Sequence, residues 1–554
     1  MGTEFVEEKG GAAVNSCAFV STNDIEIRGS LAFTWAMDAL LLGVGVGFDT
    51  KGAEKITIKQ PKNGEGVLEY EIPDSREGWV ESLELLLDAY FFGKKKPVFD
   101  YSIIRPYGEP IKSFGGVASG PDPLREMHEN ISKLLEKRMD EPLKSTDIVD
   151  IMNMIGVCVV SGNVRRSAEI SLGSPEDKDY IEMKDYNKYP QELNSHRWSS
   201  NNSILAEVGK TDYNKFIDNI SLNGEPGIVW LENMQKYSRI KDEPDWKDKF
   251  VMGCNPCSEQ SLESMETCLL TETFPSLHET WEEYKETLKY AYLYAKTITL
   301  MSTHWPETNA VMMKNRRIGM SQTGIIDAFV KHGRRAILNW CDEGYNYLKS
   351  LDETYSNWLC VPRSIKITSV KPSGSVSLLP GVSPGIHYPH SEYYIRRVRI
   401  ASDSPLLEPL KKAGYHIEQV KSGTGKTKEM TVVIEFPVWE RNFVRRKEDA
   451  SLWEQVKNAV DYQRYWADNN VSITVTFKPE EAKDIPRVLE AYEDQLKAVS
   501  FLPITDHQYE QAPYEEITKE KYHEMMKELS VPDFSNVTSQ PEGEKFCSND
   551  SCVL

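Results

Sequence analysis

The sequence predicts an α/β protein, because strand-like segments alternate with helical ones along the chain. Residues 31–42 carry apolar side chains at helical spacing, and residues 281–299 form a longer amphipathic stretch with aromatic side chains at i, i+3 and i+4. Residues 14–20 and 432–436 are short apolar runs of the length that strands have. Strands that alternate with helices are typical of a sheet covered by helices.

Each of these elements has a local reason. The strand at 14–20 comes first, and the helix at 31–42 is expected to stop at the glycine-rich segment 43–47, since glycine ends helices. The aromatic stripe of 281–299 predicts a helix face packed on the core. Residues 531–554 are polar and poor in large apolar side chains, which predicts a mobile tail.

Composition limits the classes of function. The 554 residues are 40% hydrophobic, which is enough to bury a large core. The formal net charge of -20 repels nucleic acid and anionic membranes, so a polyphosphate ligand would need a local positive site. We find no apolar run of 18 residues and no secretory signal in residues 1–11. These features predict a cytoplasmic protein that binds neither nucleic acid nor membrane.

Nine cysteines in a reducing compartment suggest redox, catalytic or metal-binding roles. Cys254 and Cys257 form a C-x2-C pair, but no second pair follows at the spacing of a zinc site, so we expect no metal site. Cys547 and Cys552 lie within eight residues of the end of the polar tail. Cysteine gains no packing there, which favours a dithiol that travels with the tail.

Residues 253–260 read Gly-Cys-Asn-Pro-Cys-Ser-Glu-Gln. In an extended loop, residues i, i+2 and i+4 point to one side, so Asn255, Cys257 and Glu259 could face one ligand. A carboxylate within reach of a hydroxyl is what general base catalysis requires. Taken alone, the same residues would fit a proline-containing turn about as well.

The motif resembles the finger loop of ribonucleotide reductase large subunits, which reads Asn-x-Cys-x-Glu and carries the radical. This resemblance implies a ten-stranded α/β barrel of the kind shared with glycyl radical enzymes, with the finger loop at its centre. It also implies that Cys257 becomes a thiyl radical that removes the 3'-hydrogen of a ribose. Glu259 would be the general base on the 3'-hydroxyl, and Asn255 would hold that hydroxyl.

Further segments match the same family. Cys17, in the strand-like segment 15–22, is similar to the family's first reducing cysteine, and Cys268 would be its partner. Loss of the 2'-hydroxyl as water needs two electrons, which a dithiol supplies when it closes to a disulfide. Cys547 and Cys552 would then reduce that disulfide by exchange, with thioredoxin or a similar protein as the external reductant.

Residues 371–377 and 381–387 resemble the family's substrate-phosphate loop, where backbone N–H groups converge on a phosphate. Alone, this motif would more often be a Ser/Gly turn. The segments 43–48, 110–121, 161–167, 196–202 and 316–320 extend the match over nearly the whole chain. Residues 161–167 and 196–202 are similar to the regions that sense the deoxynucleotide effector, although ordinary solvated loops remain an alternative. The residues implied are, for substrate, Ser16, Ser373, Gly374, Ser375 and Val376, and for the effector and specificity loops, Arg165, Arg166, Arg197 and Trp198.

The class of reductase follows from what is present and absent. No Arg-x-x-Gly-Tyr motif marks a glycyl radical, and the one Tyr-Tyr pair, Tyr393-Tyr394, follows the phosphate loop instead of lying on a late strand. The short spacing from Cys257 to Cys268 and the segments 161–170 and 506–515 resemble monomeric, adenosylcobalamin-dependent reductases of ribonucleoside triphosphates. No Asp-x-His-x-x-Gly motif is present, which agrees with base-on binding of the cofactor.

The resemblance implies a catalytic barrel over 1–530, with the effector-sensing insertion and loops at about 49–200, and a redox tail at 531–554. Family members have a helical region before the cysteine that matches Cys17, so we expect the N-terminal part of the barrel to be missing. Two alternatives stay open. One is a large subunit that needs a separate radical subunit, and the other is an inactive nucleotide-binding fragment.

Overall fold

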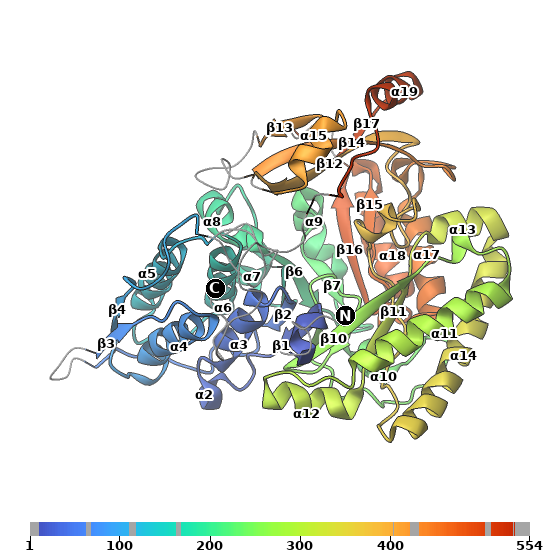
Figure 1. The fold of residues 1–554 in the computed structure, drawn as a ribbon. Coiled ribbons are helices and arrows are strands. Elements are labelled where there is room, and N and C mark those ends of the chain that lie inside the picture. The colour runs from blue at the N-terminus through green and yellow to red at the C-terminus, as the bar shows by residue number, and fades with distance from the viewer. Residues whose placement is uncertain are drawn as a thin grey trace.

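A nine-stranded mixed sheet forms the centre of the protein, here a computed structural model that describes residues 10–62, 68–109, 118–161, 168–402, 404–420, 431–504, 511–535 and 537 (Figure 1). The strand order is β11-β10-β1-β2-β5-β6-β7-β16-β15. The strands are β1 (Cys17–Val20), β2 (Gly45–Asp49), β5 (Glu169–Gly173), β6 (Ser200–Leu205), β7 (Gly227–Val229), β10 (Glu266–Thr273), β11 (Ile318–Gln322), β15 (Thr474–Phe477) and β16 (Ala498–Pro503).

The sheet consists of two parallel groups that run in opposite directions. β1, β2, β5, β6 and β7 are parallel to one another, as are β10 with β11 and β15 with β16. The groups meet in two antiparallel pairs, β1 with β10 and β7 with β16.

Residues 366–370 join the two edges of this sheet. Met320 of β11 forms a parallel bridge to Thr368, and Val370 forms one to Val471, which leads directly into β15. Backbone hydrogen bonds from Met320 N to Ile367 O (2.8 Å) and from Val370 N to Asn470 O (3.0 Å) support both bridges. The segment therefore takes the place of a tenth strand, and the sheet closes on itself.

Helices pack on the outer face of the sheet and bury their apolar faces against it. α3 (Leu31–Leu41) is almost completely buried, and α11 (Trp281–Ile298) buries Tyr284, Leu288 and Tyr292. α11 starts at a capping box made by Thr280 and Glu283. Both helices are confirmed within one residue of the predicted ends. The strand predicted at 14–20 is confirmed only from Cys17, because Gly10–Val14 forms a 3-10 turn, η1.

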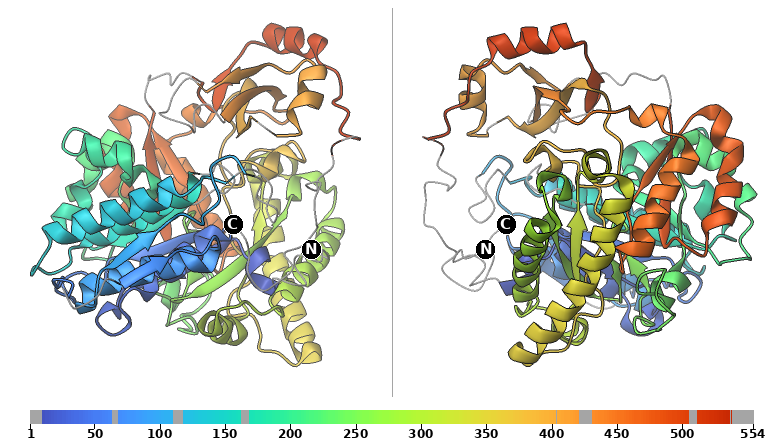
Figure 2. Two further views of the ribbon diagram at one scale, coloured as in Figure 1. Left: turned by 60° about the vertical axis from the view of Figure 1, so that its left-hand side comes forward. Right: turned by 90° about the vertical axis from the view of Figure 1, so that its right-hand side faces the viewer.

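A second sheet lies apart from the main sheet, at one end of the molecule, in all three views (Figures 1 and 2). Its order is β13-β14-β12-β17, with β12 (Tyr393–Ala401), β13 (Ile417–Gln419), β14 (Thr431–Trp439) and β17 (Tyr514–Glu516). The strand predicted at 432–436 is confirmed inside β14. The nearby helices are α15 (Leu407–Lys412) and α19 (Lys519–Glu528).

Residues 68–109 and 118–137 form a side layer that follows β2 in the chain (Figure 1). The layer holds α4 (Arg76–Phe92), α5 (Asp122–Lys137) and a parallel pair, β3 (Leu68–Glu71) and β4 (Pro97–Asp100), and α6 (Ser145–Val160) leads from it to β5. None of the helices in the described ranges combines the length and apolar character needed to cross a bilayer. The other helices are α2 (Ile25–Arg28), α7 (Lys178–Glu182), α8 (Pro190–Ser195), α9 (Ile217–Asn223), α10 (Leu231–Lys236), α12 (Pro306–Asn315), α13 (Ile325–His332), α14 (Arg334–Leu359), α17 (Leu452–Tyr465) and α18 (Ile485–Tyr492).

Candidate active site

A short hairpin carries the cysteine motif into the closed sheet. β8 (Gly253–Cys254) pairs antiparallel with β9 (Ser261–Leu262), and residues 255–260 form the loop between them. Glycines on the surrounding strands leave room for this hairpin: a Cβ at Gly47 of β2 would overlap the carbonyl oxygen of Cys254, and one at Gly319 of β11 would overlap the Gln260 amide. We call residues 253–262 the finger hairpin.

The loop of the finger hairpin is a tight turn, not the extended segment that we expected. Ser258 N donates to the Asn255 carbonyl at 2.7 Å, and Ser258 has a φ of 64°. Pro256 and Cys257 are therefore the central residues of a β-turn, for which proline at the first central position is favourable. The alternation of an extended chain does not apply here. Side-chain contacts across the turn bring the motif residues together instead.

Asn255 and Glu259 meet across this turn and contact Cys17 on β1. Asn255 Nδ2 donates to Glu259 Oε2 at 2.9 Å and lies 3.2 Å from Cys17 Sγ. Glu259 Oε1 lies 3.9 Å from the same sulfur. All three side chains are buried. Burial raises the pKa of Glu259, while Lys371 and the Asn255 amide offset part of that rise.

Cys257 projects from the tip of the turn and is exposed, unlike its buried neighbours Asn255 and Glu259. The Glu259 carboxylate, and then burial, raise the pKa of the Cys257 thiol to about 12. The residue is therefore a neutral thiol near neutral pH, with an S–H bond that a hydrogen-atom acceptor can reach. Thiolate chemistry is not favoured at this position.

Cys17 and Cys268 are direct partners on the antiparallel strands β1 and β10. Opposite residues of such strands have Cα atoms about 4.5–5.5 Å apart, which lies within disulfide reach. Both side chains are buried free thiols, and Cys268 Sγ donates to Gln260 Oε1 of the finger hairpin at 3.3 Å. Burial, then nearby charge, raises the pKa of Cys17; for Cys268 burial is again the main cause.

The predicted phosphate loop follows the strand segment 366–370 and so starts beside the finger hairpin. Ser373 has a φ of 51° and opens a turn in which Ser377 N donates to the Ser373 carbonyl at 3.0 Å, leading into η5 (Val376–Leu378). Gly374 has open space around it, since the nearest atom to a Cβ there would be the Tyr514 hydroxyl at 3.9 Å. Ser16 is exposed, with its Oγ 3.6 Å from Cys17 Sγ.

Lys371 is a site residue to which the sequence motif assigned no role. Its charge acts on Cys17, Cys257, Glu259 and Glu272, which surround the hairpin tip. Burial lowers the pKa of Lys371, but these four groups together raise it above its ordinary value. Its place at the start of the serine-rich loop was the only available indication. No spacing rule reveals which way such a lysine points.

Buried charges fix the base of the finger hairpin. Arg317 donates to both carboxylate oxygens of Asp248 at 2.7 Å and to Glu266 at 2.9 Å, and Lys366 lies 2.9 Å from Asp248. All four side chains are at most 1% exposed. Burial would raise the pKa of Asp248, but Arg317 and Lys366 lower it to about 2. We call these four residues the base cluster.

Comparisons with known proteins agree with this geometry. Residues 49–135 match the family model "B12-dependent ribonucleotide reductase, insertion domain". The chain is 49% identical to a probable adenosylcobalamin-dependent ribonucleoside-triphosphate reductase of Dictyostelium discoideum, over 100% of this chain and 75% of the relative. It is 47% identical to the adenosylcobalamin-dependent ribonucleoside-triphosphate reductase of Euglena gracilis, over 100% of this chain and 76% of the relative. The chain belongs to the B12-dependent ribonucleotide reductase family.

A solved structure supports the same assignment for the fold. The crystal structure of a B12-dependent (class II) ribonucleotide reductase has a TM-score of 0.83 and 32% identity, and the match covers 96% of this chain and 84% of that chain. The predicted α/β fold of this reductase family is thus confirmed.

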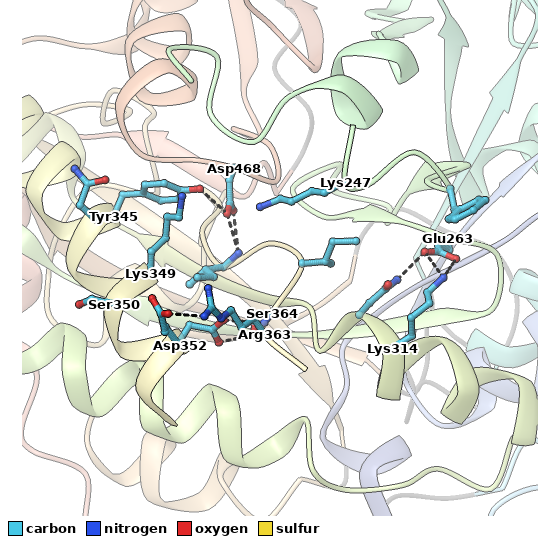
Figure 3. A pocket seen from close by; sticks show the side chains of 16 residues that line it. Lys247, Glu263, Lys314, Tyr345, Lys349, Ser350, Asp352, Arg363, Ser364 and Asp468 are labelled. Carbon is cyan, nitrogen blue, oxygen red and sulfur yellow. Dashed lines mark hydrogen bonds and ion pairs between the residues drawn. The ribbon is translucent and has the colours of Figure 1, made fainter. Parts of the chain in front are cut away.

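One cavity of this reductase is lined by none of the motif residues, and Figure 3 shows the side chains that line it. It has a volume of about 680 Å3. Its lining includes Asn315, Ile365 and Asp468, which come before β11, the segment 366–370 and β15, whereas the phosphate loop comes after the segment 366–370. It therefore lies at the opposite end of those strands. Its acidic groups have partners of their own, as with Lys314 and Glu263 at 2.7 Å. We do not assign substrate to it.

The structure describes two of the four predicted effector residues, Arg197 and Trp198. Arg197 is buried and donates to both oxygens of Asp150 at 2.7 and 2.9 Å, whereas Trp198 is exposed. The carboxylate holds the arginine in place beside α6. Arg165, Arg166, Cys547 and Cys552 lie outside the described residues, as does most of the predicted tail.

Proposed function

We propose that this chain is a ribonucleotide reductase catalytic chain that converts ribonucleoside triphosphates to 2'-deoxyribonucleoside triphosphates in the cytoplasm. One observation carries the proposal: Cys257, the Asn255–Glu259 pair and the opposed thiols Cys17 and Cys268 meet at the tip of one hairpin inside a closed sheet. The family relatives, named adenosylcobalamin-dependent ribonucleoside-triphosphate reductases, support the choice of substrate and cofactor.

The hairpin residues would act on the 3' position of the ribose. As a thiyl radical, Cys257 takes the 3'-hydrogen atom and becomes a thiol again. Glu259 accepts the proton of the 3'-hydroxyl, while Asn255 holds both the carboxylate and that hydroxyl by hydrogen bonds. The Asn255–Glu259 contact of 2.9 Å supports this division of roles, because it orients the base before substrate enters.

The opposed thiols would supply the electrons. Cys17 and Cys268 lose two electrons and two protons as they close to a disulfide, the 2'-hydroxyl leaves as water, and C2' gains a hydrogen. Cys257 then returns its hydrogen to C3'. Both thiols are neutral because burial raises their pKa values, so each can deliver hydrogen as well as an electron. One disulfide thus forms for each water released.

Substrate would lie with its triphosphate on the loop at Ser373, Gly374, Ser375 and Val376, with Ser16 beside the ribose. The open space at Gly374 supports a close approach of phosphate to the backbone. The loop follows the 366–370 strand directly, which sets the phosphate end near the hairpin tip.

The described residues include an apolar surface that fits adenosylcobalamin. A cavity of about 450 Å3 lies between the loop after η5 and the second sheet, and residues of β12 and β14 line it, among them Val398, Ile434 and Phe436. Such a wall suits the apolar faces of a large macrocycle, and we propose these residues to hold one side of it. When bound, this cofactor supplies the oxidising equivalent that turns the Cys257 thiol into a radical.

We further propose how the chain is organised. Residues 1–530 form the catalytic barrel, with the effector-sensing insertion and loops at about 49–200, including Arg165, Arg166, Arg197 and Trp198. Residues 531–554 form a tail in which Cys547 and Cys552 carry electrons from a thioredoxin-like protein. The enzyme acts as a monomer and binds a deoxynucleotide effector. The insertion-domain match at 49–135 supports the first part of this scheme.

The decisive experiment measures deoxynucleotide formation from each ribonucleoside triphosphate, with and without adenosylcobalamin, using dithiothreitol as reductant. We expect activity only with the cofactor, and loss of activity by at least about 1,000-fold in Cys257→Ser, because an O–H bond is too strong to give a useful radical. Cys360→Ser, an exposed cysteine on the far end of α14, is the matched control.

Activity without cobalamin would favour a partner-dependent reductase. No activity of the wild-type chain under any condition, with nucleotide binding retained, would favour the inactive fragment.

A further inference from the structure

The strand segment 366–370 aims Lys371 at the finger hairpin. Ser369 faces the hairpin, because its Oγ accepts a hydrogen bond from Gln260 Nε2 at 3.3 Å. Side chains two residues apart in a strand share a face, so Lys371 points to the same interior. Its backbone N–H donates to Ser321 Oγ at 2.8 Å, and Ser321 Oγ also donates to Glu272 at 2.6 Å. The position of Lys371 is thus fixed from two strands.

Lys371 is also a cation without a dedicated acid. Within the described part of the chain, it makes no ion pair of 4.0 Å or less, unlike Lys296, Lys314 and Lys366. Its charge instead acts on several acidic groups at once. A half-buried ammonium in this setting influences the ionisation of its neighbours more than it holds any one of them.

We propose that Lys371 is a positioning residue that keeps the Glu259 carboxylate ionised, so that Glu259 can accept the proton of the substrate's 3'-hydroxyl. This inference rests on the proposed function. It adds a role for a residue outside the Asn-x-Cys-x-Glu motif.

The electrostatics of Glu259 explain why such a cation is needed. A buried carboxyl favours its neutral form, and burial is the main cause that raises the pKa of Glu259. A neutral carboxylic acid cannot accept a proton. Among the main groups of the described chain that oppose the effect of burial, Lys371 is the strongest and carries a full positive charge; Asn255, the Glu259 backbone and Cys17 contribute hydrogen bonds.

The other titratable groups around Glu259 cannot replace this cation. They are thiols: Cys17 from β1, Cys268 from β10, and Cys254 and Cys257 from the finger hairpin. Each has a raised pKa and so is neutral near pH 7. On the far side of Lys371 stands Glu272, whose pKa is also raised by burial. Arg317 of the base cluster acts on Cys268 and is not among the main groups that act on Glu259.

The test is the pH dependence of a single turnover in Lys371→Met, which removes the charge and keeps the length. Pre-reduced enzyme, adenosylcobalamin and saturating triphosphate are mixed without an external thiol, so that no reductant titrates. Loss of the cation raises the pKa of Glu259 further, so the acid limb of the rate profile should move to higher pH by about one unit. Lys371→Arg keeps the charge and should restore the wild-type limb. Lys349→Met, an exposed lysine on α14, is the matched control.

The competing role for Lys371 is to bind the substrate phosphate. In that case triphosphate affinity should fall in Lys371→Met with no displacement of the acid limb, whereas our proposal expects affinity to change by less than about threefold. An unmoved limb, or loss of turnover at every pH with unchanged thermal unfolding, would overturn the proposal. If Lys371→Met did not fold, Lys371→Gln would be measured in the same way. An inactive wild type would instead contradict the proposed function itself.

Discussion

At the scale of single residues, the pairing of Cys17 with Cys268 is the most direct link between fold and redox chemistry. The two thiols are partners in a ladder, so their distance is set by the sheet and not by a loop. Their burial keeps them protonated and protects them from outside oxidants. The geometry thus stores two reducing equivalents beside the hairpin tip.

In the Cys547→Ser, Cys552→Ser double variant, whose tail cannot exchange with the new disulfide, a single turnover should therefore consume these two thiols and no others. After pre-reduced enzyme reacts once without external reductant, we expect mass spectrometry of alkylated peptides to find Cys17 and Cys268 joined. Cys17→Ser and Cys268→Ser should each lower the yield of deoxynucleotide by about 100-fold or more, because one thiol cannot supply two electrons. Cys341→Ser, which changes a buried cysteine bonded to Gln322, should retain its yield. Joined thiols elsewhere in the described chain would refute the pairing.

Residue identities near the hairpin could be predicted from sequence, whereas their arrangement could not. The motif predicted that Asn255, Cys257 and Glu259 face one ligand, and the structure places all three residues at one turn. The turn that produces it depends on the Ser258 to Asn255 hydrogen bond, which no spacing rule contains. Lys371 was missed for a similar reason. Its direction follows from the pairing of residues 366–370 with strands more than forty residues away in the chain.

At the scale of elements, the finger hairpin depends on space left by glycines. Gly45 and Gly47 alternate on β2 and both face the hairpin, since a Cβ at Gly45 would lie 3.2 Å from the Pro256 ring. From sequence, residues 43–47 were predicted as the end of a helix, and residues 43–48 as part of the family resemblance. In the structure, Gly45 and Gly47 also leave space for the finger hairpin.

Gly47→Ala should displace the finger hairpin. The added methyl group meets the backbone carbonyl of Cys254, which cannot rotate away as a side chain could. We expect a loss of about 1–3 kcal/mol in the free energy of unfolding, measured with urea, and a larger proportional loss of turnover as Cys257 shifts.

Gly344→Ala on α14 is the matched control, because its new methyl group would meet side chains and no backbone atom, at 3.1 Å or more. Equal effects of the two substitutions would show that the hairpin tolerates the methyl group.

Helices were easier to predict than the closure of the sheet. The 3.6-residue period of 31–42 and 281–299 is a local property and gave ends within one residue. Residues 366–370 carry no comparable pattern, because they are held by bridges to Met320 and Val471 and not by their own composition. That the sheet closes with ten strands was predicted from the family resemblance alone.

At the scale of the whole molecule, reducing power has to reach a disulfide inside the closed sheet. A protein reductant is too large to enter, which is why we propose a tail that carries Cys547 and Cys552. The buried positions of Cys17 and Cys268 support the need for such a carrier.

The tail is tested by a contrast between two reductants. Cys547→Ser combined with Cys552→Ser should lower turnover with a thioredoxin system to background, about 100-fold or more, while turnover with dithiothreitol stays within about twofold, because a small dithiol reaches the site unaided. Cys360→Ser again serves as control. Equal loss with both reductants would place the two cysteines in folding or in the site itself, and no loss with either would make them incidental.

The base cluster limits the side from which other molecules can reach the reacting centre. Arg317, Asp248, Glu266 and Lys366 fill the base of the finger hairpin with buried, paired charge, so we expect substrate to approach the hairpin tip from the side of the phosphate loop. In our proposal, nucleotide, cofactor and reducing tail would all approach from that side. If they do, product would have to leave before the tail could reach the disulfide, which would fix the order of these two steps.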